Sequence, residues 1–446
     1  MRKKIPCYKY VLILPLLLLL LAIFLSYDIL HRTPPVFHRH FPQGVHEVVI
    51  PPVTGIRNNL LNQISLIVEK SIADGKYPGA VILAGHRGQI IYQGVFGNRR
   101  IVPDIAPMQL DTLFDMASLT KVIATTPAIM QLIEQGKLAL DTPVAYYWPA
   151  FAKHGKDAVT IRELLTHTSG LPADLPGPKN QENLIIYPWH GQQAAYNEIE
   201  RTKLINSPGK KVVYSDINFL VLGYLVELIS GENLNQYTQN HIFKPLEMTS
   251  TFFSPAAKLQ GQIAPTQIIN NHLRWGEVHD PTAYAMGGIA GHAGLFSNAY
   301  DLSIYAQTLL NNGRLAHQTE QVNYLLGPLT ILKMTTSQTP KEITNVRGLG
   351  WDIDSSYSNR GILFPLSSYG HTGWTGTSIW IDPVTQTWVI ILTSRTHPTP
   401  ANENAVPADR QTIANIVAAS ITDTPVTNVN NTGTGELMRA YQTNEK

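Results

Sequence analysis

The stretch FDMASLTK, residues 114–121, decides the fold prediction, because the best helix-patterned segment after the N-terminal region, Val122 to Gln135, comes directly after it. We expect Ser118 to open a buried helix with Lys121 one turn later on the same face, where the lysine amine can take the proton of the serine hydroxyl. The helix N-terminus adds a positive potential that disfavours a charged ammonium and favours a developing oxyanion. Pro127 removes one backbone donor and is expected to kink the helix beyond its second turn. The stretch therefore predicts an acylating serine.

The Ser-x-x-Lys spacing is a short pattern, and a chain of this size contains it about once by chance. A second match runs from Ser207 to Lys210. Pro208 and Gly209 lie inside it and make a helix implausible there, so we interpret it as a turn. The assignment of Ser118 therefore depends on motifs further along the chain.

Composition sets limits on size and partners. The chain has 446 residues, of which 44% are hydrophobic, so it can bury the core of one large or two medium domains. The formal net charge is +2, and no Lys/Arg cluster occurs beyond the N-terminus. A nucleic-acid-binding protein is expected to carry a basic stripe. We therefore predict no nucleic-acid partner.

The first 30 residues are predicted to direct the chain to a membrane. Four basic residues in the first nine positions precede a nearly pure aliphatic run from Val11 to Leu25. The run is intermediate in length between a signal peptide and a full span, and no Ala-x-Ala-like cleavage site comes after it, which favours an uncleaved anchor over a cleaved signal. The positive-inside rule leaves the N-terminus in the cytoplasm. We expect a single-pass protein of the cell inner membrane, with its catalytic domain in the periplasm or cell exterior.

Two further segments are predicted to lie outside the folded domain. Residues 31–55 are rich in Pro and His and are interpreted as a tether, whereas residues 423–446 are polar and aperiodic and look disordered. The only cysteine, Cys7, precedes the aliphatic run, so no disulfide is expected in the exported part. That part also lacks His-x-x-x-His and a cysteine pair, and we predict no metal and no cofactor.

The fold prediction rests on where the strand patterns lie. Two β-hairpins are expected, one near each end of residues 56–422, and helical patterning dominates between them. This arrangement predicts an α/β domain with one antiparallel sheet built from both chain ends, flanking helices and an inserted, mostly helical subdomain at roughly residues 125–345. The hairpins are expected at 80–96 and 378–393. Helices are expected at 56–73, from Ile161 with Thr160 as its cap, and at 192–204, 218–229, 234–242, 301–310, 322–334 and 409–421.

Three motifs occur in an informative order: Ser118-x-x-Lys121, Tyr214-Ser215-Asp216 and His371-Thr372-Gly373. This is the layout of serine penicillin-recognising enzymes. Over roughly Ile56 to Ile421 the chain resembles the branch that holds class C β-lactamases, D-alanyl-D-alanine carboxypeptidases and related esterases. Longer stretches look most like the type 4B group of penicillin-binding proteins: WGEVHD (275–280), MGG (286–288), GHAGLFS (291–297) and YGHTGWTGT (369–377).

The resemblance implies a role for each motif. Ser118 would be the acylated nucleophile and Lys121 its proton partner. Tyr214 would pass the proton to the leaving group, which requires nearby cations to lower its pKa, and Lys121 and a protonated His371 are the available ones. The backbone N–H groups of Ser118 and Trp374 would form the oxyanion hole.

The strand that carries the last motif is implied to bind the substrate. Thr372 could hydrogen-bond a substrate carboxylate, and the chain beyond Gly373 would supply the oxyanion hole.

Two positions depart from the wider branch, which has Asn where Asp216 stands and Lys where His371 stands. An ionised Asp216 only accepts hydrogen bonds, so it can hold Lys121 but cannot donate to a substrate carbonyl, and it could also cap the helix expected from Asn218. His371 is only partly charged near neutral pH, which weakens recognition of an anionic terminus. These departures argue against fast β-lactam hydrolysis.

Some of the singled-out residues also have a non-catalytic interpretation. Tyr214 alone would be read as a packed core aromatic, and only its place between the other motifs favours catalysis. His167 and His292 lie in contexts typical of tight turns and are expected to be structural.

The sequence thus predicts a serine hydrolase of D-alanyl-D-alanine carboxypeptidase type that acts through an acyl-enzyme on peptidoglycan stem peptides and binds β-lactams. A β-lactamase or small-ester hydrolase of the same fold is an alternative, and a catalytically idle muropeptide- or partner-binding module is another. The acyl donor stays open, because loops such as 171–193 shape its pocket and carry no readable motif. The oligomeric state stays open as well.

Overall fold

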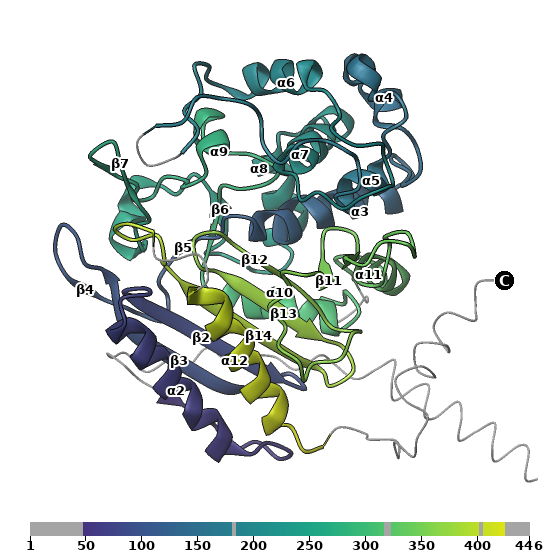
Figure 1. Cartoon of the computed structure of the whole chain (residues 1–446). Coiled ribbons are helices and arrows are strands. Elements are labelled where there is room, and N and C mark those ends of the chain that lie inside the picture. The colour runs from purple at the N-terminus through teal and green to yellow at the C-terminus, as the bar shows by residue number, and fades with distance from the viewer. Residues whose placement is uncertain (1–47, 181–183, 316–322, 401–404, 424–446) are drawn as a thin grey trace, which may run out of the picture.

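The computed structural model describes residues 48–180, 184–315, 323–400 and 405–423. The predicted membrane anchor, most of the predicted tether and all but the first residue of the predicted tail lie outside these ranges. The described chain forms one large antiparallel sheet between two helical layers (Figure 1).

The large sheet is assembled from both ends of the chain, as predicted. Its centre is the pairing of β2 with β14, in register from His86 opposite Thr387 to Ala80 opposite Thr393. In spatial order the strands are β1 (Val48–Val49), β3 (Gln89–Arg100), β2 (Gly79–His86), β14 (Thr387–Thr393), β13 (Ser378–Asp382), β12 (Tyr369–Thr372), β11 (Asp352–Asp354) and β10 (Val346–Arg347), with β4 (Ala106–Pro107) paired to β3.

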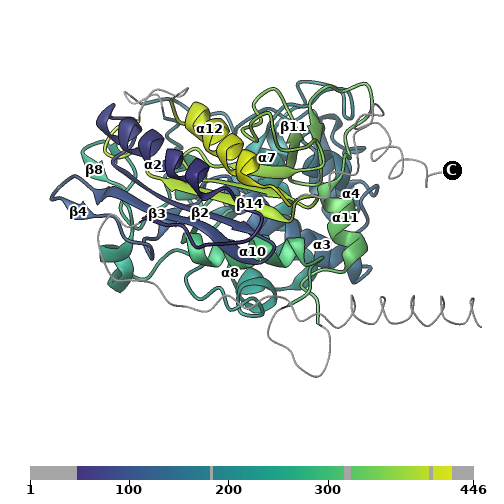
Figure 2. The same ribbon diagram turned by 90° about the horizontal axis from the view of Figure 1, so that it is seen from below.

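Both faces of the sheet centre are covered. β2 and β14 are buried along their whole length, which fits their continuous rather than alternating apolar sequence. Helices α2 (Asn58–Ala73) and α12 (Ala405–Ser420) lie side by side on one face (Figure 2), and α10 (Ala299–Leu310) packs on the other. The first and last helices of the domain therefore close the same layer.

The helical part lies between the two halves of the sheet in sequence. Its α-helices are α3 (Thr126–Glu134), α4 (Val144–Tyr147), α5 (Ile161–Leu165), α6 (Gln192–Arg201), α7 (Asp216–Ser230), α8 (Leu234–Thr238), α9 (Pro281–Ala285) and α11 (Pro328–Thr335). Two small sheets accompany them: β5 (Phe114–Asp115) with β9 (Leu295–Ser297) and β6 (Phe252–Phe253), and β7 (Ile268–Ile269) with β8 (His272–Leu273).

Most predicted elements are present, with shifted ends. The short helix α5 starts with the expected Thr160 cap, completed by Glu163 into a capping box. The helix expected over 322–334 is wrong in its first half, because residues 323–327 are not helical and α11 begins only at Pro328. The predicted tether also contains strand β1, which pairs with β3. Asp423, the first residue of the predicted disordered tail, is ordered against the sheet, since its carboxylate contacts His86 and Arg87.

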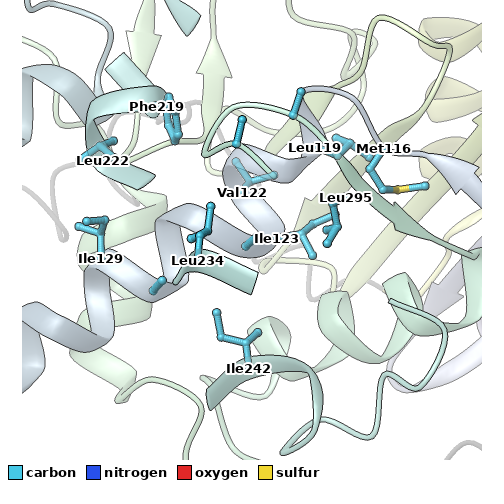
Figure 3. Close-up of a cluster of buried hydrophobic side chains, with 14 of the residues drawn as sticks. Met116, Leu119, Val122, Ile123, Ile129, Phe219, Leu222, Leu234, Ile242 and Leu295 are labelled. Atoms are coloured by element: carbon cyan, nitrogen blue, oxygen red, sulfur yellow. The ribbon is translucent and has the colours of Figure 1, made fainter. Parts of the chain in front are cut away.

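The apolar core surrounds the segment that carries the Ser-x-x-Lys motif (Figure 3). Leu119, Val122 and Ile123 are fully buried there, and Phe219 of α7 and Leu295 of β9 belong to the same cluster. The core therefore holds the motif in place from several sides.

No single helix in the described ranges is long and apolar enough to cross a bilayer. One bent pair, Asp216–Ser230 with Leu234–Phe243 at 78°, meets the length and composition criteria, but most of the first helix of that pair is buried in the protein core.

Candidate active site

Ser118 lies in a tight turn just before the helix rather than inside it, since the first helical residue is Leu119. The preceding Ala117 has φ 46°, a left-handed conformation that is strained for a residue with a Cβ. The buried carboxylate of Asp115 supports this turn by accepting from Ala117 N at 2.8 Å and from His279 N at 2.7 Å. Burial raises the pKa of Asp115 to about 6, although both hydrogen bonds oppose the shift. The nucleophile candidate therefore sits on a pre-shaped backbone.

Lys121 begins a π-helical turn, Lys121–Thr125, whose five residues are all buried. Thr126 N donates to Lys121 O, and α3 continues from there with Pro127 as its second residue. The helix irregularity that we expected at Pro127 is therefore a wider, π-helical turn that comes before the proline. Pro127 itself lies in the first turn of α3, where the absence of its backbone N–H donor is tolerated.

The Lys121 ammonium is fully buried and contacts polar groups from several segments. Nζ donates to Ser118 Oγ at 3.0 Å and to His292 O at 3.1 Å, and it lies 2.6 Å from Asp216 Oδ1. It also lies 5.0 Å from the ring centroid of Tyr214. Burial lowers the pKa of Lys121, but Asp216 and Tyr214 outweigh burial and raise it above its ordinary value. The prediction that the helix N-terminus disfavours a charged Lys121 is therefore wrong, because the Asp216 carboxylate 2.6 Å away stabilises the ammonium more than the helix N-terminus destabilises it.

Asp216 is the first residue of α7 and does not act as its cap. The N-cap position belongs to Ser215, whose side chain donates to Pro172 O at 2.6 Å instead. The capping interpretation of Asp216 is wrong, because its carboxylate pairs with Lys121.

Tyr214 is placed next to both members of the Ser-x-x-Lys motif. Burial raises its pKa, while Lys121 and a hydrogen bond with Ser118 lower it, and the net shift is upward. The imidazole of His167 stacks on its ring with 4.4 Å between centroids, and His167 Nδ1 accepts from Ser215 N at 3.1 Å. His167 therefore serves the structural role expected of it and holds the Tyr214 segment. Contrary to expectation, the resting phenol is not acidified.

His371 on β12 is not the cation that the sequence suggested. Burial above all, and then Arg347 and Lys121, lower its pKa well below 6.5, so the imidazole is neutral. Its Nδ1 lies 2.9 Å from Thr372 O. The charge that lowers the pKa of His371 most is the Arg347 guanidinium, whose Cζ lies 6.0 Å from the ring centroid of Tyr214.

Arg347 is a site residue that the sequence analysis missed. It lies on β10, is fully buried, and donates to Tyr357 Oη at 3.0 Å and to Gly350 O at 3.1 Å. No local motif marks this arginine. Only the pairing of β10 with β11, and of β11 with β12, brings it beside His371.

Hydrogen bonds join the segment directly after β12 to the turn that precedes Ser118. Thr377 Oγ1 donates to Met116 O at 3.1 Å, Thr375 Oγ1 donates to Asp115 O at 2.7 Å, and Gly373 N donates to Thr377 O at 2.7 Å. Among the hydrogen bonds formed within the described ranges, none uses the backbone N–H groups of Ser118 or Trp374 as donors. These are the two groups that the resemblance implied for the oxyanion hole.

A cavity of about 540 Å³ opens at Ser118 and Tyr214. Its wall carries three arginines, namely Arg347, Arg395 and Arg410, beside Asp352. Burial raises the pKa of Asp352. The other lining residues are Ser356, Tyr357, Ser358, Asn359, His371, Thr372, Gly373, Trp374, Val406, Pro407 and Gln411.

Two of these arginines contact Trp374 or the backbone next to it. Arg395 Cζ lies 4.4 Å from the indole centroid and its Nε donates to Trp374 O, while Arg410 Nη2 donates to Gly373 O at 3.1 Å and to Thr377 O at 2.9 Å. The indole itself is 48% exposed. The cavity thus combines positive charge with an accessible aromatic face.

Two carboxylates near Lys121, those of Asp216 and Asp280, do not line the cavity. Asp280 Oδ1 accepts from His292 Nε2 at 2.8 Å and from Ala283 N at 2.8 Å. Asp216, Asp280 and His292 offer ligand atoms within 4.8 Å of one another, a spacing that could hold a metal ion. Asp280 and Asp216 raise the pKa of His292 against the effect of burial, so His292 and Lys121 already supply positive charge there. A divalent cation would be repelled by both.

Comparisons with known proteins agree with this geometry. The family model described as beta-lactamase matches residues 64–413. A relative from Escherichia coli (strain K12), provisionally named D-alanyl-D-alanine carboxypeptidase, is 34% identical over 378 residues, covering 78% of this chain and 85% of the relative. A relative of the same name from Salmonella typhi is 31% identical over 389 residues, covering 80% of this chain and 88% of its own.

Solved structures show the same fold. EstCE1, a hydrolase with promiscuous acyltransferase activity, aligns with a TM-score of 0.65 at 22% identity over 81% of this chain and 99% of its own. A penicillin-binding protein homologue from Caulobacter crescentus aligns with a TM-score of 0.65 at 19% identity over 84% of this chain and 100% of its own. Because the family model matches residues 64–413, the chain belongs to the β-lactamase family.

Proposed function

We propose that this protein is a serine-type D-alanyl-D-alanine carboxypeptidase that acts through an acyl-enzyme on cell-wall peptides. The observation that carries the proposal is the 3.0 Å hydrogen bond between Lys121 Nζ and Ser118 Oγ in a site that also holds Tyr214. The provisional names of the curated relatives support the same substrate class.

The first step forms an ester. Ser118 Oγ attacks the carbonyl carbon of the penultimate D-alanine, and its proton passes to Lys121 as the Lys121 ammonium gives one of its own protons to Asp216, 2.6 Å away. Tyr214 donates its phenolic proton to the departing amine of the last D-alanine. Lys121 then returns a proton to Tyr214 and recovers its own from Asp216. The N–H groups of Ser118 and Trp374 are the donors proposed for the oxyanion. A water molecule then hydrolyses the ester by the same groups acting in reverse.

The charge on the cavity wall supports a substrate that ends in a carboxylate. Arg347, Arg395 and Arg410 line the same cavity as Ser118, whereas His371 is neutral. A guanidinium binds a carboxylate through paired, charge-assisted hydrogen bonds. Thr372 adds a hydroxyl at the same wall. We therefore assign recognition of the terminal carboxylate to the arginines, with Thr372, rather than to His371.

We further propose that residues 1–30 anchor the protein in the cell inner membrane, with residues 56–422 outside the cytoplasm. The basic residues before the Val11–Leu25 aliphatic run support this orientation. Protein isolated from cells should keep its N-terminus and sediment with membranes. Release by osmotic shock of a chain that begins near residue 27 would contradict the anchor.

The catalytic assignment is tested by covalent labelling of the detergent-solubilised full chain. A penicillin or fluorophosphonate probe should add one label, which maps to Ser118 by mass spectrometry and is lost in Ser118→Ala. Ser207→Ala, at the second Ser-x-x-Lys match, is the matched control and should label normally. Labelling that persists in Ser118→Ala, or that maps to Ser207, would overturn the assignment.

Turnover separates the alternatives. A D-alanyl-D-alanine peptide, a chromogenic cephalosporin and a short-chain nitrophenyl ester should be hydrolysed in that order of preference by a carboxypeptidase. A preference for the cephalosporin or the ester would favour a β-lactamase or an esterase of the same fold. No turnover and no acylation would favour a muropeptide- or partner-binding module.

A further inference from the structure

Arg410 of α12 holds the turn that comes directly after β12. Its Nη2 carries two hydrogens and donates to two carbonyls, to Gly373 O at 3.1 Å and to Thr377 O at 2.9 Å. The same turn is closed by the hydrogen bond of 2.7 Å from Gly373 N to Thr377 O. The guanidinium therefore bridges both ends of this turn.

The partners of Arg410 are unusual for a buried cation. Arg410 is 6% exposed, and within the described ranges it forms no ion pair with a carboxylate. The carboxylate of the preceding Asp409 pairs with Lys76 at 2.9 Å and accepts from the Tyr77 hydroxyl at 3.1 Å instead. Burying a charge without a counter-ion costs stability. The placement of this cation on two backbone carbonyls therefore points to a role for that backbone.

The peptide that joins Gly373 to Trp374 connects Arg410 to the proposed oxyanion hole. This peptide bond is trans, so its C=O and its N–H point in opposite directions within one plane. Gly373 O accepts from Arg410 Nη2 and from Gly376 N, each at 3.1 Å. These two hydrogen bonds fix the direction of the C=O. The Trp374 N–H is therefore directed away from Arg410.

Gly373 also lies against the turn that precedes Ser118, since a Cβ on this glycine would be 2.6 Å from Met116 O. Ser118, Trp374 and Arg410 all line the cavity of about 540 Å³. No hydrogen bond within the described part of the chain uses the Trp374 N–H. This N–H is therefore available to an oxygen atom of a molecule bound beside Ser118.

We propose that Arg410 is a positioning residue of this site, which fixes the Gly373–Trp374 peptide so that the Trp374 N–H faces the oxyanion formed on the substrate carbonyl. This inference rests on the proposed function. A cation at the carbonyl oxygen also polarises the peptide and makes its N–H a stronger donor. Because the negative charge develops only in the transition state, Arg410 speeds acylation without tightening the initial complex.

This role and the recognition of a substrate carboxylate predict different selectivity for Arg410. Loss of carboxylate recognition slows only those probes that carry a carboxylate. Loss of a positioned oxyanion donor slows every acylating probe. A penicillin carries a carboxylate and a neutral alkyl fluorophosphonate does not, whereas both place an oxygen atom where the oxyanion forms. The two probes therefore separate the two roles.

The test is the rate at which each probe labels Ser118 in the detergent-solubilised full chain. Arg410→Ala should lower the limiting rate constant roughly 10²-fold for both probes, the lower end of the usual cost of one lost oxyanion donor. The dissociation constant of the initial penicillin complex should stay unchanged. Guanidinium ions at a non-denaturing concentration should restore much of the rate, because the deleted side chain opens onto the cavity, whereas sodium chloride at the same ionic strength should not.

Arg100→Ala is the matched control. Arg100 is also a buried arginine, 9% exposed, but it does not line the cavity and pairs with Asp104 at 2.6 Å. This variant should label at the unaltered rate with and without guanidinium. If Arg410→Ala does not fold, Arg410→Lys replaces it. Lysine keeps the charge but loses the planar fork, so both probes should label roughly tenfold more slowly.

Slowing of the penicillin alone would overturn the inference and leave Arg410 with the substrate carboxylate. Unaltered rates in the Arg410 variants would overturn it as well, and so would slowing that guanidinium does not relieve in folded Arg410→Ala. Failure of the unaltered chain to label at Ser118 would instead overturn the proposed function, and the positioning role with it.

Discussion

The ammonium of Lys121 and the carboxylate of Asp216 form an ion pair of 2.6 Å inside the protein, where the lysine side chain is fully buried and the aspartate side chain is 19% exposed. The pair is the electrostatic centre of the site, since it raises the pKa of Lys121 despite burial. It also joins the helix after Ser118 to the start of α7.

Removing the carboxylate should destabilise the protein. In Asp216→Asn the buried ammonium loses its counter-charge, and breaking a buried pair typically costs about 3–5 kcal/mol. We expect the free energy of unfolding in urea to fall by about that much at pH 7 and by less at alkaline pH, where the unpaired lysine can lose its proton. Asp74→Asn removes the exposed Lys70–Asp74 pair and should cost no more than about 1 kcal/mol. Equal losses in the two variants would contradict the prediction.

Arg347 should determine preference for carboxylate-bearing substrates. Arg347→Lys keeps a cation but loses the planar fork that pairs with a carboxylate. We expect kcat/KM for a D-alanyl-D-alanine peptide to fall roughly tenfold relative to kcat/KM for a neutral ester, a discrimination of about 1.4 kcal/mol. Because the readout is a ratio, a general loss of folded protein cancels. An unchanged ratio would assign carboxylate recognition to Arg395 or Arg410 instead.

His371→Lys gives the complementary test at the same edge. The substitution adds a permanent cation where the imidazole is neutral. If this position faces the substrate carboxylate, the ratio of kcat/KM for the D-alanyl-D-alanine peptide to kcat/KM for the neutral ester should rise. No rise would show that the residue only packs against the site.

Gly373 should be intolerant of a side chain. A Cβ at this position would lie 2.1 Å from Thr377 Oγ1 and 2.6 Å from Met116 O, so the end of β12 would have to move away from the nucleophile turn. Gly373→Ala should therefore displace the Trp374 N–H from the proposed oxyanion hole and slow acylation about 10²–10³-fold, the usual cost of one lost donor. Gly261→Ala meets nothing within 4 Å and is the control. Similar acylation rates in both variants would argue against Trp374 as the donor.

Buried histidines should make the protein less stable in acid. Burial lowers the pKa of His279 from 6.5 to about 4. As the pH falls, the unfolded chain takes up a proton first, so the stability contributed by neutral His279 is complete above about pH 6.5 and is lost as the pH drops toward 4. The loss amounts to about 3 kcal/mol. His279→Gln should flatten the pH dependence of the unfolding free energy by that amount, whereas His190→Gln, at an exposed position, should not.

The sequence by itself determined those features that depend on local spacing. The three-residue step from Ser118 to Lys121 places both side chains together in any helical turn. Apolar runs of strand length around two short turns predicted one hairpin near each end of the domain's sequence, and these two hairpins are neighbours at the centre of the sheet. Gly231 after α7 closes that helix in a left-handed conformation with φ 78°, as its position predicted. The family was recognisable from motifs of the same local kind.

The tertiary structure alone decided the charges of the site. Whether Lys121 is an ammonium and His371 is neutral depends on burial and on partners that lie far away in sequence, such as Asp216 and Arg347. Protonation is set by the dielectric surroundings and the nearest charges, and folding brings both together from distant parts of the chain.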